Sequence, residues 1–164
     1  MINQRRLHEM FEYVHTTGHL IHRYTVQGGK RAGQIAGSPH NCGYLQICID
    51  RKKYLIHRLI FVYVYGRWPT QIDHVNGVRS DNRIENLREC TYTQNHGNKG
   101  LNRNNTSGFK GVCYCRKDRA WIADLAGSRL GNFRTKELAA AAYDRAAILY
   151  YGDFALTNKS LGLL

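Results

Sequence analysis

A carboxylate and an imidazole are neighbours at Asp73 and His74, and two carboxamides, Asn86 and Asn95, follow in the next part of the chain. Carboxylate and carboxamide oxygens are hard ligands, which suit Mg²⁺ or Mn²⁺ better than zinc. An imidazole is the side chain best suited to take a proton from water near neutral pH. A cation and a base of this kind are what the hydrolysis of a phosphodiester requires.

The expected secondary structure brings these residues together. The pattern predicts a strand that ends at Asp73 and His74, a second strand that begins at Asn86, and a short helix that carries Asn95. Because neighbours in a strand point to opposite sides, Asp73 and His74 serve one site only if the chain bends there, and the turn Asn76-Gly77 is placed to bend it. A satisfied structural Asp-His pair is the alternative.

Other polar residues near this pair have a simpler interpretation. Asn76, Asp81 and Asn82 are expected to be turn residues whose side chains bond to their own backbone. His57 and Arg58 lie in a mostly apolar segment. Either both pack in the core with the guanidinium of Arg58 reaching the surface, or Arg58 contacts a phosphate.

The stretch IDHVNGVRSDNRIENLRECTYTQNHGN resembles the core of the HNH endonuclease family, as do the upstream HR of YLIHRL and the WP before the first strand. The resemblance implies a ββα-metal (His-Me finger) nuclease that cuts DNA with a divalent cation. It makes His74 the general base, Asn86 the residue that orients the imidazole and pins the loop, and Asp73 with Asn95 the metal ligands. Many relatives have His at the position of Asn95, so His96 is the alternative ligand; the phage and intron homing branch commonly has Asn there.

The charge of the chain indicates a polyanionic partner. Among 164 residues, 24 Lys and Arg outweigh 12 Asp and Glu, which gives a net charge of +12 and favours double-stranded DNA as the partner. The excess is shared, with 14 basic and 7 acidic side chains in residues 1–99 and 10 and 5 in residues 100–164. Because 18 aromatic residues are interspersed with the charge, the basic surface is expected to belong to folded structure.

Nothing in the sequence suggests secretion or a membrane. The first residues, MINQRRLHEM, lack an apolar core, and the longest apolar run, Leu59 to Tyr65, is far shorter than the roughly 20 residues of a membrane span. We therefore expect a soluble protein in the cytoplasm of the host cell, with the DNA. The five cysteines contain no CxxC pair and are expected to be reduced and mostly buried.

Two small modules are expected. Residues 1–98 form the nuclease module, with an N-terminal β-rich extension and a ββα core at about 70–98, and 99–107 is an Asn- and Gly-rich linker to 108–164. Within the first module, the pattern predicts a short helix around Leu7 to Val14, turns at Gly18 and Gly28-Gly29, a hairpin in GYLQICIDRKKYLI, a helix in HRLIFVYVYG, and a cap at Thr91 or Thr93 for the helix of the core.

The second module is expected to be a three-stranded sheet packed on one helix. The strands are GFKGVCYC, RAWIADL and SRLGNF, and the helix runs from the N-cap Thr135 to the stop at Gly152. Its sheet-facing residues are expected to be a stripe at helical spacing, namely Leu138, Ala142, Ala146 and Leu149.

This module resembles the Apetala-two/ethylene-response-factor DNA-binding domain in Gly111-Val112, Trp121, LGNF, AAAAYDRAA and YGDFALTN. The resemblance implies that the outer sheet face binds DNA. Cys113 and Cys115 stand where the plant proteins have arginines, and Arg129 where they have Trp, so guanine readout like theirs is not expected. Phosphate and backbone contacts are expected instead from Arg116, Lys117, Arg119, Arg129 and Trp121, with solvation of the basic residues and core packing of Trp121 as alternatives.

The sequence thus predicts an α+β, homing-type HNH DNA endonuclease in which Asp73 and Asn95 hold a cation at the scissile phosphate and His74 activates water. Arg83, Arg88 and Lys99 are expected to add phosphate contacts. A non-catalytic, sequence-tolerant DNA-binding regulator is the alternative. No protein partner is evident, although cleavage of both strands by one active site would require a homodimer or two sequential nicks.

Overall fold

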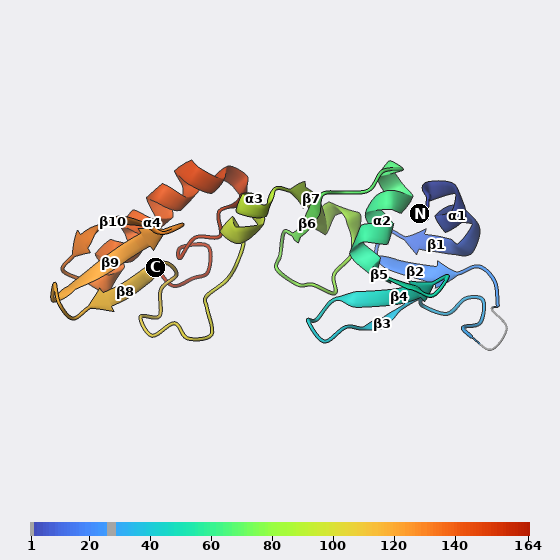
Figure 1. Ribbon diagram of the computed structural model, residues 1–164, viewed down its shortest axis with the longest axis horizontal. Helices are drawn as coiled ribbons and strands as arrows, with labels where there is room; N and C mark the ends of the chain where they lie inside the picture. Colours follow the sequence, from blue (N-terminus) through green and yellow to red (C-terminus); the bar gives the residue numbers. More distant parts are fainter. Residues whose placement is uncertain (1, 26–28) are drawn as a thin grey trace. The chain divides into compact units, whose positions relative to one another are not determined.

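Two compact units make up the chain. The computed structural model describes residues 2–25 and 29–164, and its contacts divide the chain into Met1–Thr91 (unit 1) and Tyr92–Leu164 (unit 2). Each unit has a hydrophobic core and small antiparallel sheets with few helices, so the fold is α+β, as the sequence predicts (Figure 1).

Unit 1 contains three small antiparallel sheets, β1–β2, β3–β4–β5 and β6–β7. Its elements are, in chain order, α1 (Gln4–Met10), β1 (Phe11–Val14), β2 (His19–His22), β3 (Ser38–Pro39), β4 (Leu45–Ile49), β5 (Lys52–Leu55), α2 (Ile56–Tyr65), β6 (Gln71–His74), the 3₁₀ helix η1 (Ile84–Asn86) and β7 (Leu87–Cys90). The helix expected at 7–14 is wrong in extent, because the chain becomes extended at Phe11 and pairs with β2. The turn expected at Gly28-Gly29 lies partly outside the described residues.

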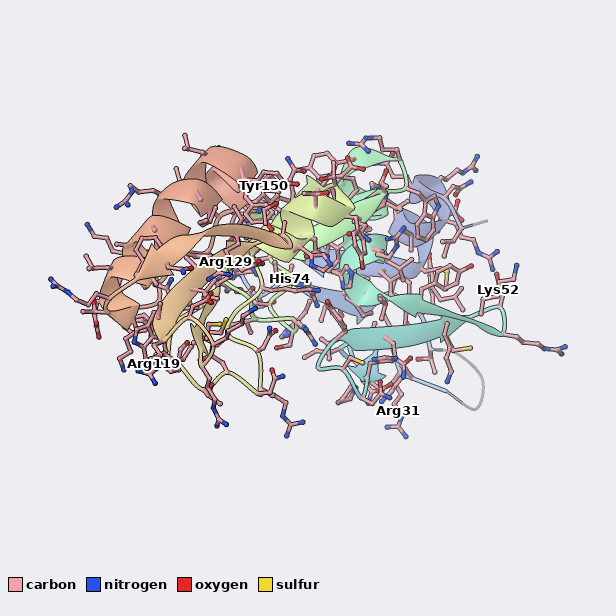
Figure 2. All side chains as sticks on the ribbon, turned by 60° about the vertical axis from the view of Figure 1, so that its left-hand side comes forward. Arg31, Lys52, His74, Arg119, Arg129 and Tyr150 are labelled. Atoms are coloured by element: carbon pink, nitrogen blue, oxygen red, sulfur yellow. The ribbon has the colours of Figure 1, made fainter. Side chains whose placement is uncertain are left out.

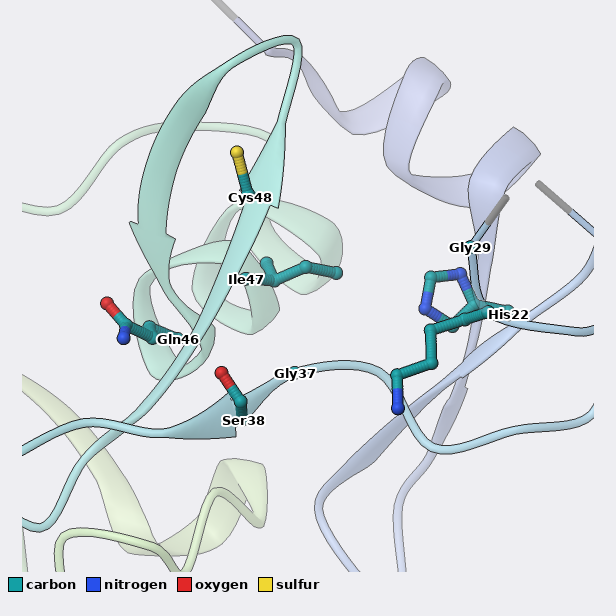
Figure 3. Close-up of a pocket in the computed structure, with 8 residues that line it drawn as sticks. His22, Gly29, Gly37, Ser38, Gln46, Ile47 and Cys48 are labelled. Atoms are coloured by element: carbon teal, nitrogen blue, oxygen red, sulfur yellow. The ribbon is translucent and has the colours of Figure 1, made fainter. Parts of the chain in front are cut away.

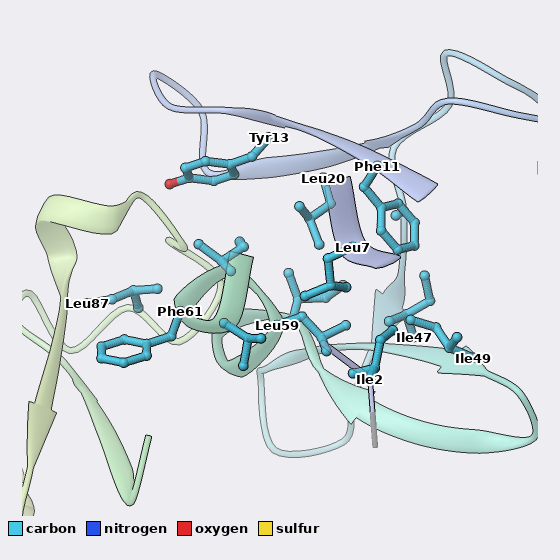
Figure 4. Packing of buried hydrophobic residues seen from close by; sticks show 14 of the residues in the cluster. Ile2, Leu7, Phe11, Tyr13, Leu20, Ile47, Ile49, Leu59, Phe61 and Leu87 are labelled. Atoms are coloured by element: carbon cyan, nitrogen blue, oxygen red, sulfur yellow. The ribbon is translucent and has the colours of Figure 1, made fainter. Parts of the chain in front are cut away.

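The expected hairpin and the helix after it are both present. β4 and β5 are joined at Asp50 and Arg51, both with positive φ, and α2 ends at Gly66 in the left-handed conformation. α2 is the centre of the unit 1 core: Leu59, Ile60 and four other residues of the helix are buried. The core also takes side chains from α1, β1, β2 and β4 (Figure 4). α2 therefore connects the hairpins to the β6–β7 strands.

Unit 2 contains the expected three-stranded sheet and helix. Its elements are α3 (Tyr92–Gly97), β8 (Val112–Cys115), β9 (Ala120–Leu125), β10 (Ser128–Phe133), α4 (Lys136–Tyr151) and the 3₁₀ helix η2 (Gly152–Phe154). The strand order is β10-β9-β8, and α4 packs on the sheet. Thr135 caps α4, as predicted, by accepting a hydrogen bond from the Leu138 N–H.

The boundary between the units differs from the expected domain limits. It lies before α3, so residues 92–98 and the segment 99–107 belong to unit 2. α3 is held there because the Gly97 carbonyl accepts hydrogen bonds from the Leu156 N–H (3.1 Å) and from Lys110 Nζ (2.7 Å). A Cβ at Gly97 would lie 2.6 Å from Cγ of Tyr151, so only glycine permits this close packing.

The predicted sheet-facing side of α4 is wrong for Leu138 and Leu149, whereas Ala142 and Ala146 are partly buried against the core. Leu138 and Leu149 are 53% and 88% exposed, whereas the buried residues lie on another face. These are Ala139, Ala140, Tyr143, Asp144, Ala147 and Tyr151. α4 is apolar around most of its circumference, so spacing alone does not select a face. The tyrosines decide it, because Tyr143 packs where Gly111 has no side chain, and a Cβ there would lie 2.0 Å from the ring.

The expectation that the cysteines are mostly buried is also wrong. All five are free, but only Cys90 is buried, while Cys42, Cys48 and Cys113 are exposed and Cys115 is intermediate. Three of these sit on strand faces that point away from a core. In the part of the chain that the structure describes, no helix combines the length and apolar character needed to cross a bilayer.

A buried polar network ties the C-terminal residues of unit 2 to its sheet and to α3. The Asn158 side chain exchanges hydrogen bonds with the backbone of Lys110 and donates to Asp144. The Lys110 ammonium donates to the carbonyls of Gly97 and Leu156, at 2.7 and 2.8 Å. Burial lowers the pKa of Lys110 to about 8.

We predict that Lys110 makes the stability of unit 2 depend on pH. Because the pKa of Lys110 is lower in the folded protein than its ordinary value of 10.5, the unfolded chain alone keeps the proton between pH 8 and 10, and the free energy of unfolding should rise there. The slope should approach about 1.4 kcal/mol per pH unit. The neutral amine still has two N–H groups for the two carbonyls.

The measurement is urea unfolding followed by Trp121 fluorescence in a Trp68→Phe background, compared with the same protein carrying Lys110→Met. The variant should be less stable and should lack the rise with pH. Parallel pH curves for the two proteins would contradict the prediction.

Candidate active site

The carboxylate and imidazole lie at the end of β6, directly before a tight turn. In the β6–β7 pair, Asp73 is opposite Arg88 and His74 is opposite Leu87. The Gly77 N–H donates to the His74 carbonyl at 2.8 Å, and Gly77 has a φ of +72°. The strand therefore continues through His74, so the bend expected at the Asp73-His74 pair comes after it, at the Asn76-Gly77 turn.

Asp73 is held by an ion pair across the strands. Its Oδ2 accepts hydrogen bonds from Arg88 Nε (2.9 Å) and approaches Arg88 Nη2 (2.8 Å). The side chain of Asp73 is only 7% exposed. Arg88, which was expected to contact phosphate, thus fixes a buried carboxylate.

His74 lies in a buried aromatic environment. It is 4% exposed, and its ring is 5.1 Å from that of His57 and 5.8 Å from that of Tyr44. Burial lowers the pKa of His74, and it lowers the pKa of His57 to about 3. Both imidazoles are therefore neutral at pH 7, and His74 is able to accept a proton.

Asn82 is the side chain that contacts the imidazole. Its Oδ1 lies 3.3 Å from His74 Nε2, and this interaction opposes the effect of burial on the pKa of His74. Because a carboxamide oxygen only accepts hydrogen bonds, this contact favours the imidazole tautomer with the proton on Nε2 and the lone pair on Nδ1. Asn82 is 1% exposed.

Asn86 holds the loop rather than the imidazole. Its Oδ1 accepts from the Asn76 N–H (2.9 Å) and its Nδ2 donates to the Asp81 carbonyl (2.8 Å). Its own carbonyl accepts from the Val75 N–H at 2.9 Å. Both polar atoms of the side chain are used by the backbone, so orientation of the imidazole, expected from Asn86, comes from Asn82.

The N-terminal hairpin β1–β2 clamps the segment that carries Asn82. The Tyr13 hydroxyl donates to the Asn82 carbonyl (3.1 Å) and accepts from the Ile84 N–H (2.8 Å). A Cβ on Gly18, at the hairpin turn, would lie 2.4 Å from the backbone of Asn82 and Arg83. The β-rich extension is therefore part of the scaffold of the site.

Sequence reasoning missed three residues of this arrangement, namely Asn82, Tyr13 and His57. Asn82 stands in a run of turn residues, and nothing in its spacing separates it from Asn76. The buried Nδ1 of His57 has no hydrogen-bond partner within residues 2–25 and 29–164. The sequence feature that could have indicated His57 is its position beside Arg58 in an otherwise apolar helix.

The other basic residues expected to contact DNA in the first module have intramolecular contacts. Arg58 donates to the carbonyls of Pro69 (2.7 Å) and Thr70 (3.3 Å), which fixes the entry into β6. Arg83 forms two hydrogen bonds with Asp81, at 2.9 and 2.7 Å. Lys99, which belongs to unit 2, is exposed and lies 3.2 Å from the His96 ring.

The expected DNA-binding residues of the C-terminal sheet fall into three groups. Arg116, Lys117 and Arg119 are exposed at the β8–β9 turn, where Figure 2 labels Arg119. Arg129 is bound to Asp118 and Asn132. Trp121 is partly buried on the helix-facing side of the sheet, with its ring 5.2 Å from that of Tyr114. The contacts of Trp121 are therefore those of a residue packed against the core, which was the alternative to a contact with DNA.

The three side chains considered as metal ligands belong to different units. Asp73 is in unit 1, whereas Asn95 and His96 are on α3 of unit 2. Among the described residues, no group of three or more His, Cys, Asp and Glu side chains is arranged to hold a metal ion. Carboxylate and carboxamide oxygens nevertheless fit Mg²⁺ or Mn²⁺, because Mg²⁺ in nucleic-acid enzymes commonly takes one or two protein ligands and completes its shell with water and phosphate.

Comparison with known proteins identifies the region that carries this geometry. Residues 54–96 match the family described as HNH endonuclease. The chain is 28% identical over 116 residues to an uncharacterized HNH endonuclease of Acanthamoeba polyphaga mimivirus, covering 69% of this chain and 62% of that protein. It is 31% identical over 68 residues to Protein 3.8 of Escherichia phage T7, covering 41% of this chain and 56% of that protein.

The chain therefore spans less than two thirds of the length of either relative. No solved structure shows a significant match to it. The matched segment begins in β5 and includes Asp73, His74, Asn82 and Asn86. Residues 54–96 are therefore the part of this chain that is similar to HNH endonucleases.

Proposed function

We propose that this chain is a metal-dependent DNA endonuclease of the homing type, with a ββα-metal nuclease module. The observation that carries the proposal is the state of His74: a buried, neutral imidazole whose Nε2 is engaged by Asn82, beside a carboxylate on the same strand, within the HNH segment. A purely structural histidine does not require a neighbouring carboxylate held by its own arginine, as Asp73 is held by Arg88.

His74 acts as the general base. Its Nδ1 takes a proton from water, the water oxygen forms a bond to the scissile phosphorus, and the bond from phosphorus to the 3′ oxygen breaks in line with the attack. Asn82 keeps the Nε2 proton in place, so that the lone pair stays on Nδ1 during the transfer. Asn86 fastens the loop that carries Asn82.

Asp73 is the proposed ligand of Mg²⁺ or Mn²⁺ in unit 1; Asn95, with His96 as the alternative, is the further ligand that the resemblance to the family implies. A cation bound there supplies neutralisation of the scissile phosphate and stabilisation of the leaving 3′ oxygen. Arg88 holds the Asp73 carboxylate in place for this role.

Unit 2 is proposed to bind double-stranded DNA, in the manner of the Apetala-two-like domain that it resembles. Its exposed cations at the β8–β9 turn, Arg116, Lys117 and Arg119, suit phosphate contacts. Arg129 is less suited, because Asp118 and Asn132 already occupy its guanidinium.

A non-catalytic DNA-binding regulator is the alternative from another class. Plasmid incubated with the protein, first with Mg²⁺ and then with EDTA, separates the two. Nicked or linear products that need Mg²⁺ support the nuclease, whereas binding without metal-dependent cleavage supports the regulator. Mapping the ends on both strands shows whether one strand or both are cut; cleavage of both would require a homodimer or two sequential nicks.

We predict that His74→Ala abolishes cleavage and leaves DNA binding nearly intact, because the imidazole supplies the base but makes no contribution to the basic surface. Loss of a general base commonly costs about 10²- to 10⁴-fold in rate. His15→Ala is the matched control, since His15 is exposed in the same unit. The measurements are plasmid nicking and gel-shift affinity; undiminished nicking by His74→Ala would refute the assignment.

We predict that Asn82→Ala lowers kcat about 10- to 100-fold with little change in KM, as loss of a partner that orients a histidine commonly does. Asn82→Asp should retain more activity, because its carboxylate still accepts a hydrogen bond from the Nε2–H of His74 and raises the pKa of the imidazole. The pH–rate profile is the decisive measurement. The acidic limb should move to higher pH in Asn82→Asp, and an unshifted limb would exclude contact between residue 82 and the base.

A further inference from the structure

Most arginines of unit 1 near the active site are already bound within the protein. Arg58 is held by two carbonyls, Arg83 by Asp81 and Arg88 by Asp73. A phosphate would have to compete with these contacts. Within the described part of the chain, by contrast, Lys53 forms no ion pair and is exposed on the β4–β5 hairpin.

Lys53 belongs to a polar sheet face that points away from the core. Ile47 and Ile49 of β4 are buried, so the residues that alternate with them lie on the other side. In register, Ser38 of β3 is opposite Gln46, and Cys48 is opposite Lys53. We call these four residues, Ser38, Gln46, Cys48 and Lys53, the outer sheet face.

A hollow of about 300 Å³ borders the outer sheet face on the β3 side. Figure 3 shows Gln46 and Cys48 along β4, Ser38 on the neighbouring strand and His22 across the hollow. His22 is 9% exposed, and its Nε2 has no hydrogen-bond partner among the residues described. Lys30 also lines the hollow, and burial, with a smaller contribution from the charge of Lys30, lowers the pKa of His22. The hollow thus offers a cation and an unsatisfied polar atom.

A second hollow, of about 340 Å³, borders the same face on the other side of Gln46. It is lined by Tyr44, Gln46 and Lys53, among others. The ring of Tyr44 is 5.0 Å from that of His57 and 5.8 Å from that of His74, and the Arg79 guanidinium lies 5.2 Å above it. The outer sheet face is therefore continuous with the surroundings of the base.

We propose that the outer sheet face binds the backbone of the duplex next to the cleavage site. Lys53 and Lys30 contact phosphates, and Gln46 and Ser38 donate hydrogen bonds to phosphate or sugar oxygens. Contacts of this kind fix register and are indifferent to base sequence. The choice of DNA as the partner rests on the proposed function, but the binding itself is testable without cleavage.

The test uses the full chain and a fluorescein-labelled 30-bp duplex of mixed sequence, in EDTA, so that only binding is measured. The affinity is determined at several NaCl concentrations for Lys53→Gln, for Lys30→Gln with Lys53→Gln, and for Lys52→Gln. Lys52 is the matched control, because it is exposed on the same hairpin but alternates with Lys53 and is opposite the buried Ile49 (Figure 2 labels Lys52).

A plot of log affinity against log salt concentration has a negative slope. Its magnitude should decrease by about 0.9 for each phosphate-contacting lysine that is replaced. Lys53→Gln should therefore lower this magnitude once and the double variant twice, with Lys52→Gln close to the unaltered protein. Equal effects of Lys53→Gln and Lys52→Gln would show a general charge effect and overturn the proposal, as would unchanged slopes.

Cys48 gives a second measurement without any substitution. Its exposed thiol lies on the outer sheet face, so bound duplex should slow its alkylation by N-ethylmaleimide, read by mass spectrometry. Unslowed alkylation at saturating duplex would contradict the proposal. Because neither measurement needs cleavage, a protein that binds through Lys53 but does not nick DNA would refute the nuclease and leave this surface intact.

Discussion

The contact between Asn82 Oδ1 and His74 Nε2 is the interaction on which the site depends, and much of unit 1 serves to hold it. Asn82 lies in a segment without regular structure, which would sample many conformations by itself. Three restraints remove that freedom: the Tyr13 hydroxyl on its carbonyl, the close approach of Gly18, and the Asn86 side chain on the loop. By holding Asn82, the N-terminal hairpin favours the proton on Nε2 of His74, a residue far from the hairpin in sequence.

Burial of His74 keeps its imidazole neutral, but it also leaves nearby polar atoms without hydrogen bonds. His57 and Tyr44 surround the His74 ring with little water, which keeps the imidazole neutral. The same burial leaves Asn82 Nδ2 and His57 Nδ1 without hydrogen-bond partners among the described residues. Unsatisfied buried groups of this kind cost about 1–3 kcal/mol each. The surroundings of His74 therefore hold its imidazole in one position at a cost in the stability of the fold.

The sequence could predict what local pattern determines. The β4–β5 hairpin, α2 and the C-terminal sheet with its capped helix follow from alternation, turn residues and caps, and the Asp73-His74 pair was found from its residue types. Long-range packing was not predictable. The buried face of α4 depends on Tyr143, whose ring packs where Gly111 has no side chain. Asn82, and not Asn86, contacts the imidazole because Tyr13, in a hairpin some 70 residues away in the chain, holds the Asn82 backbone.

The ion pair between Asp73 and Arg88 has a consequence for substrate binding. An isolated carboxylate at the proposed cleavage site would repel the phosphodiester of the proposed substrate, and in partly buried surroundings this repulsion is weakly screened. Arg88 cancels that charge locally while its own side chain is only 23% exposed. Removal of one member of a buried pair leaves the other uncompensated, at a cost of about 3–5 kcal/mol. In the proposed nuclease, Arg88 would therefore neutralise the Asp73 carboxylate beside the phosphate and would not contact the DNA directly.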